Sequence, residues 1–126
     1  ELGATLAGMC FDAPHYFVDG HDPVDQFRTF RDIVGCVHLS DCLVGDDLHR
    51  PFNCGGAMPI NEFLSTLRDY NFGGFITLEL KPHSMKELGV YIDSYMMTLQ
   101  HLNYKKYLTT KLRIFALRPL INRFAA

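Results

Sequence analysis

The sequence predicts an α/β fold with a parallel sheet. Short apolar runs alternate three times with amphipathic helical stretches, which is typical of β-α units whose crossover connections make neighbouring strands parallel. The 126 residues are 48% hydrophobic and 21% charged, so one globular domain with a substantial core is expected. Four cysteines, none of them in a C-x-x-C pair, are expected to be free thiols: Cys10, Cys36, Cys42 and Cys54.

The first half of the chain is predicted to contain two strands separated by a helix. Residues 6–11 are nearly all apolar, which favours a strand covered on both faces. A loop is predicted over residues 15–20, and the pair Asp22-Pro23 then supplies an N-cap and a proline for the first helical turn. That helix is expected to end near residue 32, and residues 33–39 are expected to form the second strand.

The second half repeats this pattern after a long loop. Residues 40–59 are rich in Asp, Gly, Asn and Pro, and a loop of this length is typical of a functional segment. An apolar stripe at helical spacing starts at Ile60, and the glycine pair 73–74 is predicted to end that helix before a strand over residues 75–80. A further helix is predicted over residues 84–103, with five residues on its buried side: Leu88, Tyr91, Ile92, Tyr95 and Met96.

The charge distribution limits the expected partners. The first 104 residues hold six Lys and Arg against fourteen Asp and Glu, a net of −8 that would repel a nucleic-acid backbone. No run of about 18 uninterrupted apolar residues occurs, and the first residues lack the layout of a secretory signal. Neither nucleic acid nor a membrane is therefore an expected partner, and a cytoplasmic location is predicted.

The end of the chain differs from the body in its charge. No acidic residue follows Asp93, whereas six basic residues do. We therefore predict a body over residues 1–103 and a basic helical extension over residues 104–126. A solvated basic face is the simpler interpretation of this extension, and contact with an anionic surface is the alternative.

Ionisable residues follow each predicted strand, which is where a barrel of parallel strands builds its functional site. Asp12 and His15 form a D-x-x-H pair after the first strand, His38 lies on the second strand, and Glu79 ends the third. Two carboxylates and an imidazole from three strands make a mixed oxygen and nitrogen site for a divalent ion. Asp12, His38 and Glu79 are therefore the predicted metal ligands, and Mn²⁺, Mg²⁺, Co²⁺ or Zn²⁺ would suit them.

A second group of ionisable residues lies in the long loop. Asp47 and His49 form a D-x-H pair, whose side chains would point the same way in a locally extended segment. Taken singly, a histidine at a strand end is more often a hydrogen-bonded structural residue than a ligand, and the adjacent aspartates 46 and 47 are most often a solvated turn. The joint occurrence of these residues at successive strand ends favours a site.

Several short motifs resemble the xylose-isomerase-like superfamily, which includes sugar phosphate isomerases and epimerases as well as endonuclease IV. The resemblance covers about residues 1–82, in five runs that keep the family's order: C-F-D-A-P-H at 10–15, G-H-D-P at 20–23, V-H-L-S-D at 37–41, D-D-L-H at 46–49 and I-T-L-E at 76–79. It implies strands five to eight, the C-terminal half, of a (β/α)8 TIM barrel. The glycine-rich stretch, commonly G-x-G in the family, departs from that pattern and reads N-C-G-G at 53–56.

The resemblance also implies roles for individual residues. In the sugar epimerases, the residues matched by Asp12, His38 and Glu79 bind one divalent metal together with a Glu from strand four. That Glu has no match here, since Glu1 precedes Asp12 by only 11 residues. Three further residues match family positions that either contact the substrate or, in endonuclease IV, bind further zinc ions: His15, Asp47 and His49.

The favoured hypothesis is a sugar or sugar phosphate isomerase or epimerase that transfers a proton through an enediolate. The metal would polarise the substrate carbonyl, and a carboxylate on each face of the carbon would remove and return the proton. Glu79 is the predicted catalytic residue and the strand-four Glu its partner. Because three or four β/α units leave unpaired sheet edges, we also expect an N-terminal half-barrel or a second copy of the chain to complete the barrel. The alternatives are a zinc-dependent phosphodiesterase that resembles endonuclease IV and acts on abasic DNA, and a non-catalytic half-barrel remnant.

Overall fold

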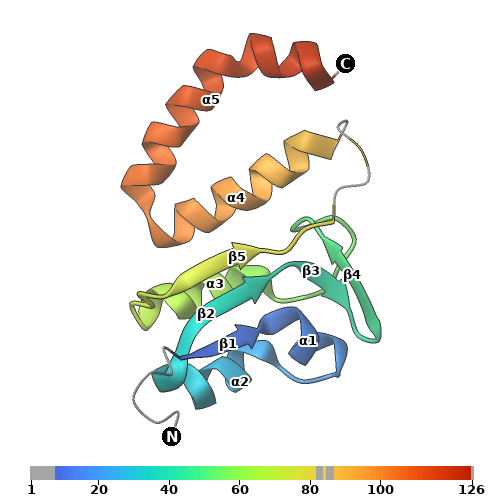
Figure 1. Ribbon diagram of the computed structural model, residues 1–126, viewed down its shortest axis with the longest axis vertical. Helices are drawn as coiled ribbons and strands as arrows, with labels where there is room; N and C mark the ends of the chain where they lie inside the picture. The colour runs from blue at the N-terminus through green and yellow to red at the C-terminus, as the bar shows by residue number, and fades with distance from the viewer. Residues whose placement is uncertain (1–7, 82–83, 85–86, 126) are drawn as a thin grey trace, which may run out of the picture.

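The computed structural model describes residues 8–81, 84 and 87–125, and these residues form an α/β fold (Figure 1). Strands β1 (Met9–Asp12), β2 (Val34–Leu39) and β5 (Phe75–Leu78) make a parallel sheet in the order β1-β2-β5. The parallel sheet confirms the predicted fold class. The first predicted strand starts in residues 6–7, which lie outside the described part of the chain.

One face of the sheet carries the hydrophobic core. Phe11, Val37 and Leu39 are fully buried there, under helices α2 (Pro23–Phe30) and α3 (Ile60–Asp69). The aromatic ring of Phe11 lies 5.7 Å from the ring of Phe27 and 6.0 Å from that of Phe63, in contacts that join the sheet to both helices. Because side chains alternate between the faces of a strand, the residues between these buried ones lie on the opposite face.

That opposite face, which we call the open face, is less covered. Cys10 and Thr77 are exposed, and Phe75 keeps 81% of its surface accessible. In a closed barrel of parallel strands, the face turned away from the helices points to the barrel interior. The described residues supply three parallel strands, so here this face remains open.

Helix α1 (Ala13–Val18) replaces most of the loop that was predicted over residues 15–20. The carboxylate of Asp12 accepts the backbone N–H of His15 at 3.3 Å and so acts as the N-cap. Pro14 lies in the first turn, where a missing N–H costs no hydrogen bond. The prediction was wrong because the six-residue helix is too short to show a periodic apolar pattern.

The long segment over residues 40–59 contains an antiparallel hairpin instead of a continuous loop. Strand β3 (Asp41–Leu43) pairs with β4 (Asp46–Arg50), and Gly45 adopts a positive φ of 75° in the turn between them. The hairpin lies at the end of the parallel sheet to which its strands point (Figure 1). The sequence prediction missed it because its Asp-rich strands lack the usual β-forming residues.

Helix α3 ends earlier than predicted. Its last residue is Asp69, and Asn71 takes the left-handed conformation at φ 51° that the glycine pair was expected to provide. Gly74 does not end the helix; it allows the backbone to approach strand β2 closely, because a Cβ there would collide with the backbone of Gly35. A short 3-10 turn, η1 (Arg31–Ile33), precedes that strand.

Helices α4 (Leu88–Leu102) and α5 (Tyr104–Ala125) complete the fold, with α5 farthest from the sheet in Figure 1. The buried side of α4 is formed by Ser94, Thr98 and Leu99, whereas Tyr95 is exposed, contrary to the prediction. The other four residues predicted on that side are partly buried. Apolar residues surround most of α4, so periodicity could not identify the packed side. No described helix combines the length and apolarity that a membrane crossing needs.

Candidate metal centre

The ends of three parallel strands bring the predicted ligands together. Asp12 is the last residue of β1, His38 lies on β2, and Glu79 follows β5 directly. Asp12 is the register partner of His38, which in turn pairs with Thr77. These positions share the open face, so the carboxylates and the imidazole project to the same side at the same end of the sheet. This confirms the predicted placement of the strand-end residues.

The geometry of these three side chains fits a small ion. One potential ligand atom from each of Asp12, His38 and Glu79 lies within 4.8 Å of the other two. Nδ1 of His38 is 3.5 Å from Oδ2 of Asp12 and 3.3 Å from Oε2 of Glu79. Two carboxylates facing one imidazole nitrogen leave oxygen and nitrogen lone pairs around a common point, as a mixed-ligand divalent site requires.

His15, Asp47 and His49 form a second group that adjoins the first. Oδ2 of Asp47 lies 3.4 Å from Nε2 of His15 and 3.4 Å from Nε2 of His49. Nδ1 of His15 is 2.8 Å from Oδ2 of Asp12, and Nδ1 of His49 is 4.0 Å from Oε2 of Glu79. All six predicted site residues therefore belong to one continuous cluster.

The backbone of β4 aims the second group at the first. His49 adopts φ 49°, a left-handed conformation that is uncommon for non-glycine residues, although histidine tolerates it better than most. Its side chain is only 10% exposed, yet its Nδ1 atom has no hydrogen-bond partner, and the same is true of Oδ1 of Asp47. Unpaired buried polar atoms are costly, so their presence beside the strand-end cluster is a second sign that the site fits a cation or a polar ligand.

Hydrogen bonding determines the electrostatics of His15. Its hydrogen bond with Asp12 raises the pKa of His15, burial lowers it by less than that, and the charges of Asp12, Asp47 and Glu79 raise it further. The imidazole is also more than half exposed. It is therefore the group of the cluster best suited to donate a hydrogen bond to a bound substrate oxygen.

Asp41 is a structural residue of the site that the sequence analysis did not single out. Its buried carboxylate accepts the N–H of Cys42 at 3.0 Å and of Met58 at 3.3 Å, and also faces the N–H groups of Asn53 and Gly56. Burial raises the pKa of Asp41, while these N–H groups act to lower it. One carboxylate thus holds the segment after β4 against the hairpin.

This contact accounts for the two glycines of the N-C-G-G stretch at 53–56. A Cβ at position 56 would collide with the carboxylate of Asp41, and Gly55 has a positive φ of 86°. Both glycines are therefore required by the turn that Asp41 organises. The sequence shows the glycine pair, but only the fold identifies the buried carboxylate of Asp41 as the group that the glycines accommodate.

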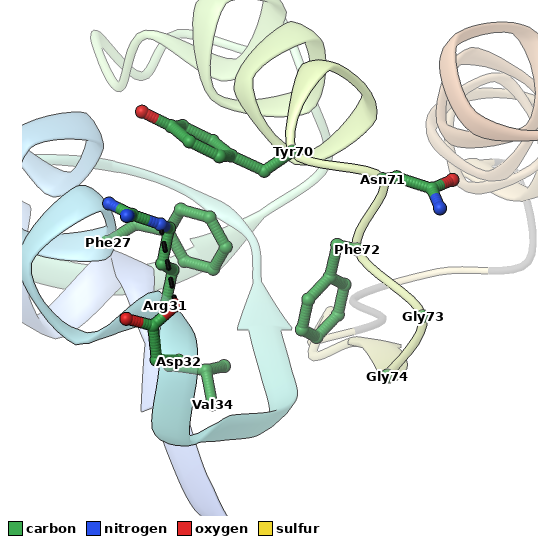
Figure 2. A pocket seen from close by; sticks show the side chains of 9 residues that line it. All are labelled: Phe27, Arg31, Asp32, Val34, Tyr70, Asn71, Phe72, Gly73 and Gly74. Atoms are coloured by element: carbon green, nitrogen blue, oxygen red, sulfur yellow. Dashed lines mark ion pairs between the residues drawn. The ribbon is translucent and has the colours of Figure 1, made fainter.

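A pocket of about 250 Å³ lies at the other end of the sheet, where β2 and β5 begin (Figure 2). The guanidinium of Arg31 sits 4.9 Å from the ring centroid of Tyr70 and forms an ion pair with Asp32 at 3.6 Å. The pocket shares no residue with the strand-end cluster. In barrels of parallel strands this end contributes to stability, and the functional groups lie at the opposite end.

The fold and the cluster together define a β/α protein of the barrel class, with ionisable residues at the C-terminal ends of its parallel strands. The chain belongs to the xylose isomerase-like TIM barrel family, whose family model matches residues 1–107. Members of this family generally bind divalent metal ions and sugars or sugar-like substrates. No curated protein and no solved structure shows significant similarity to the chain.

Proposed function

We propose that the chain carries part of the active site of a metal-assisted sugar or sugar phosphate isomerase or epimerase. The observation that carries this proposal is the convergence of Asp12, His38 and Glu79, whose ligand atoms lie within 4.8 Å of one another at one end of a parallel sheet. A divalent ion held by these residues would polarise the carbonyl and the neighbouring hydroxyl of a sugar.

Glu79 is the residue that we assign to proton transfer. Its side chain is 45% exposed, so one carboxylate oxygen can reach a substrate carbon while the other faces His38. The reaction needs a base because a proton next to a carbonyl is only weakly acidic. Removal of that proton gives an enediolate, and its return to the same or the neighbouring carbon gives the epimer or the isomer.

His15 and His49 fit substrate binding in this proposal. The raised pKa of His15 favours its protonated form, which donates hydrogen bonds to substrate oxygens. His49 is oriented by Asp47, with 3.4 Å between Nε2 and Oδ2, and its Nδ1 atom lacks a hydrogen-bond partner. Because that Nδ1 atom is buried, His49 serves this proposal by holding Asp47 beside the exposed His15.

The family mechanism also uses a second carboxylate from strand four. Glu1, the acidic residue nearest to Asp12 on its N-terminal side, lies outside the described residues. We therefore assign Glu79 one half of the proton transfer, and in the family mechanism the strand-four Glu carries out the other half.

Deuterium exchange tests this function directly. The full-length protein is incubated with Mn²⁺ in D₂O with free and phosphorylated ketoses, and exchange at the carbon next to the carbonyl is followed by NMR. We expect Mn²⁺-dependent exchange that Glu79→Gln abolishes and Glu62→Gln, an exposed change on α3, leaves intact. Exchange that persists in Glu79→Gln would exclude the assigned role, and no exchange with any ketose would favour a non-catalytic barrel.

The arrangement of the second group supports zinc-dependent phosphodiester hydrolysis as a rival function. His15, Asp47 and His49 lie beside the strand-end ligands, as a site for several ions would need. The net charge of −8 over the first 104 residues argues against binding of a DNA backbone. Cleavage of an abasic duplex by the zinc-loaded protein, without ketose exchange, would favour this alternative.

A further inference from the structure

Two cysteines lie next to the candidate metal centre on the open face of the sheet. Cys10 on β1 and Cys36 on β2 are register partners, two residues before Asp12 and His38 on the same strands. The strand period of two places all four side chains on one face. The cysteines therefore form the layer of the open face directly below the strand-end carboxylates.

His38 links the two layers. A ring nitrogen of His38 and the sulfur atoms of Cys10 and Cys36 lie within 4.8 Å of one another. Two thiols and an imidazole are the ligand types that thiophilic ions such as Zn²⁺ and Co²⁺ bind, in contrast to the oxygen-rich set formed with Asp12 and Glu79. One strand position thus serves two groups of different ligand chemistry.

We propose that Cys10, Cys36 and His38 form a second metal site that binds a thiophilic divalent cation such as Zn²⁺. Binding converts both thiols to thiolates, and their two protons pass to the solvent. Three protein ligands leave the fourth position of a tetrahedral ion to water. This site does not depend on the proposed isomerase function, because it uses its own sulfur ligands.

Sharing of His38 makes the two sites compete. A neutral imidazole carries a proton on one nitrogen and offers a lone pair on the other, so it serves one ion at a time. A thiophilic ion on the cysteines therefore withdraws His38 from Asp12 and Glu79. We expect Zn²⁺ to weaken the binding of Mn²⁺ to the strand-end carboxylates by this competition.

The other two cysteines provide contrast and control. Cys42 is fully buried, its sulfur contacts the carbonyl oxygen of Pro14 at 3.6 Å, and burial raises the pKa of Cys42 to about 11. Cys54 is exposed in the turn after β4 and does not belong to the Cys10, Cys36 and His38 group. Cys54→Ser is therefore a matched control for loss of one exposed thiol.

Cobalt titration of the reduced full chain tests the site, because Co²⁺ bound to thiolates gives a ligand-to-metal charge-transfer absorption in the near ultraviolet. We expect this absorption at equimolar Co²⁺ in the unmodified chain and in Cys54→Ser. Cys10→Ser and Cys36→Ser should each lose this absorption. Each variant should bind Co²⁺ more than about 100-fold more weakly, a larger loss than removal of a residue that only hydrogen-bonds to a ligand would cause. Asp12→Asn should keep it, and circular dichroism confirms that each variant folds.

Proton release supplies an independent measurement. Calorimetric titration of Zn²⁺ in two buffers of different ionisation enthalpy should show release of the two thiol protons in the unmodified chain and release of fewer protons in Cys10→Ser. Absence of a thiolate band at equimolar Co²⁺ would overturn the proposal, as would a band that persists in both folded serine variants. Failure of the ketose exchange assay would leave these results unchanged, so the two proposals are tested separately.

Discussion

Nδ1 of His38 lies 3.3 Å from Oε2 of Glu79, and the two residues come from neighbouring parallel strands. This relationship depends on register, because a slip of one residue on either strand would turn its side chain to the core face. The same register buries Val37 and Leu39 on the other side of β2. Core packing therefore determines which side chains meet at the candidate metal centre.

The first prediction concerns the contribution of Glu79 to metal binding. Glu79→Gln keeps the size of the side chain but removes the negative charge that faces His38. We expect its affinity for Mn²⁺ to fall at least about tenfold, equivalent to about 1.4 kcal/mol, with little change in stability because the side chain is half exposed. Titration calorimetry beside Glu62→Gln measures the difference, and equal affinity in both variants would remove Glu79 from the ligand set.

The second prediction concerns the close approach of Gly56 to Asp41. Gly56→Ala places a methyl group where the buried carboxylate of Asp41 lies, so we expect a loss of about 1 to 3 kcal/mol in the free energy of unfolding. Gly73→Ala is the matched control, because no heavy atom lies within 4 Å of its added Cβ. Urea denaturation of both variants decides, and an equal effect of the two would show that the segment after β4 yields without cost.

The third prediction follows from the pKa of His101. Burial, assisted by the charge of Arg68, lowers this pKa below the ordinary value of 6.5. The unfolded chain then takes up the proton first as the pH falls, so folding stability present above pH 6.5 is lost between 6.5 and the lowered value. Nδ1 of His101 lies 3.4 Å from Oγ of Ser65, a contact that links α4 to α3.

A non-titrating variant isolates this effect. His101→Gln keeps a polar group near Ser65 but takes up no proton in this range. Urea midpoints measured at about pH 7.5 and about pH 5.5 should therefore differ less in His101→Gln than in the unmodified chain. If both proteins lose the same stability between these pH values, other groups carry the dependence.

The parallel sheet and the strand-end residues could be predicted because they follow from local rules. Apolar runs indicate strands, β-α alternation makes them parallel, and parallel strands present their ends at one edge. The convergence of Asp12, His38 and Glu79 could therefore be predicted without knowing how the helices pack on the sheet. The resemblance to the family added the roles, which the ketose and metal experiments test.

Other features could not be predicted because they depend on contacts between distant segments. His49 adopts a positive φ in the β3-β4 hairpin, and its Nδ1 atom lacks a hydrogen-bond partner there. The carboxylate of Asp41 accepts the N–H of Met58, 17 positions away. The buried side of α4 follows from Ser94, whose hydroxyl accepts the N–H of Phe52 at 2.9 Å across 42 positions. Local periodicity does not report such long-range contacts.

The last prediction concerns the open face and the edges of the parallel sheet. Phe75 keeps 81% of its surface accessible on the outermost described strand, β5, where backbone groups on the free side are available to a further strand. An apolar ring beside such an edge favours self-association. We therefore expect light scattering at micromolar concentration to give a mass above the 14.4 kDa of one chain.

Two lysine substitutions identify the responsible surface. Phe75→Lys should lower the measured mass, because it places a charge on the open face next to the edge strand. Phe115→Lys changes another highly exposed ring, 73% accessible, on the distant helix α5 and should leave the mass unchanged. A reduction by Phe115→Lys alone would assign association to the basic extension. A monomeric unmodified chain with strong amide protection in β5 would show that the open edge is stable in water and that no further strands are needed to cover it.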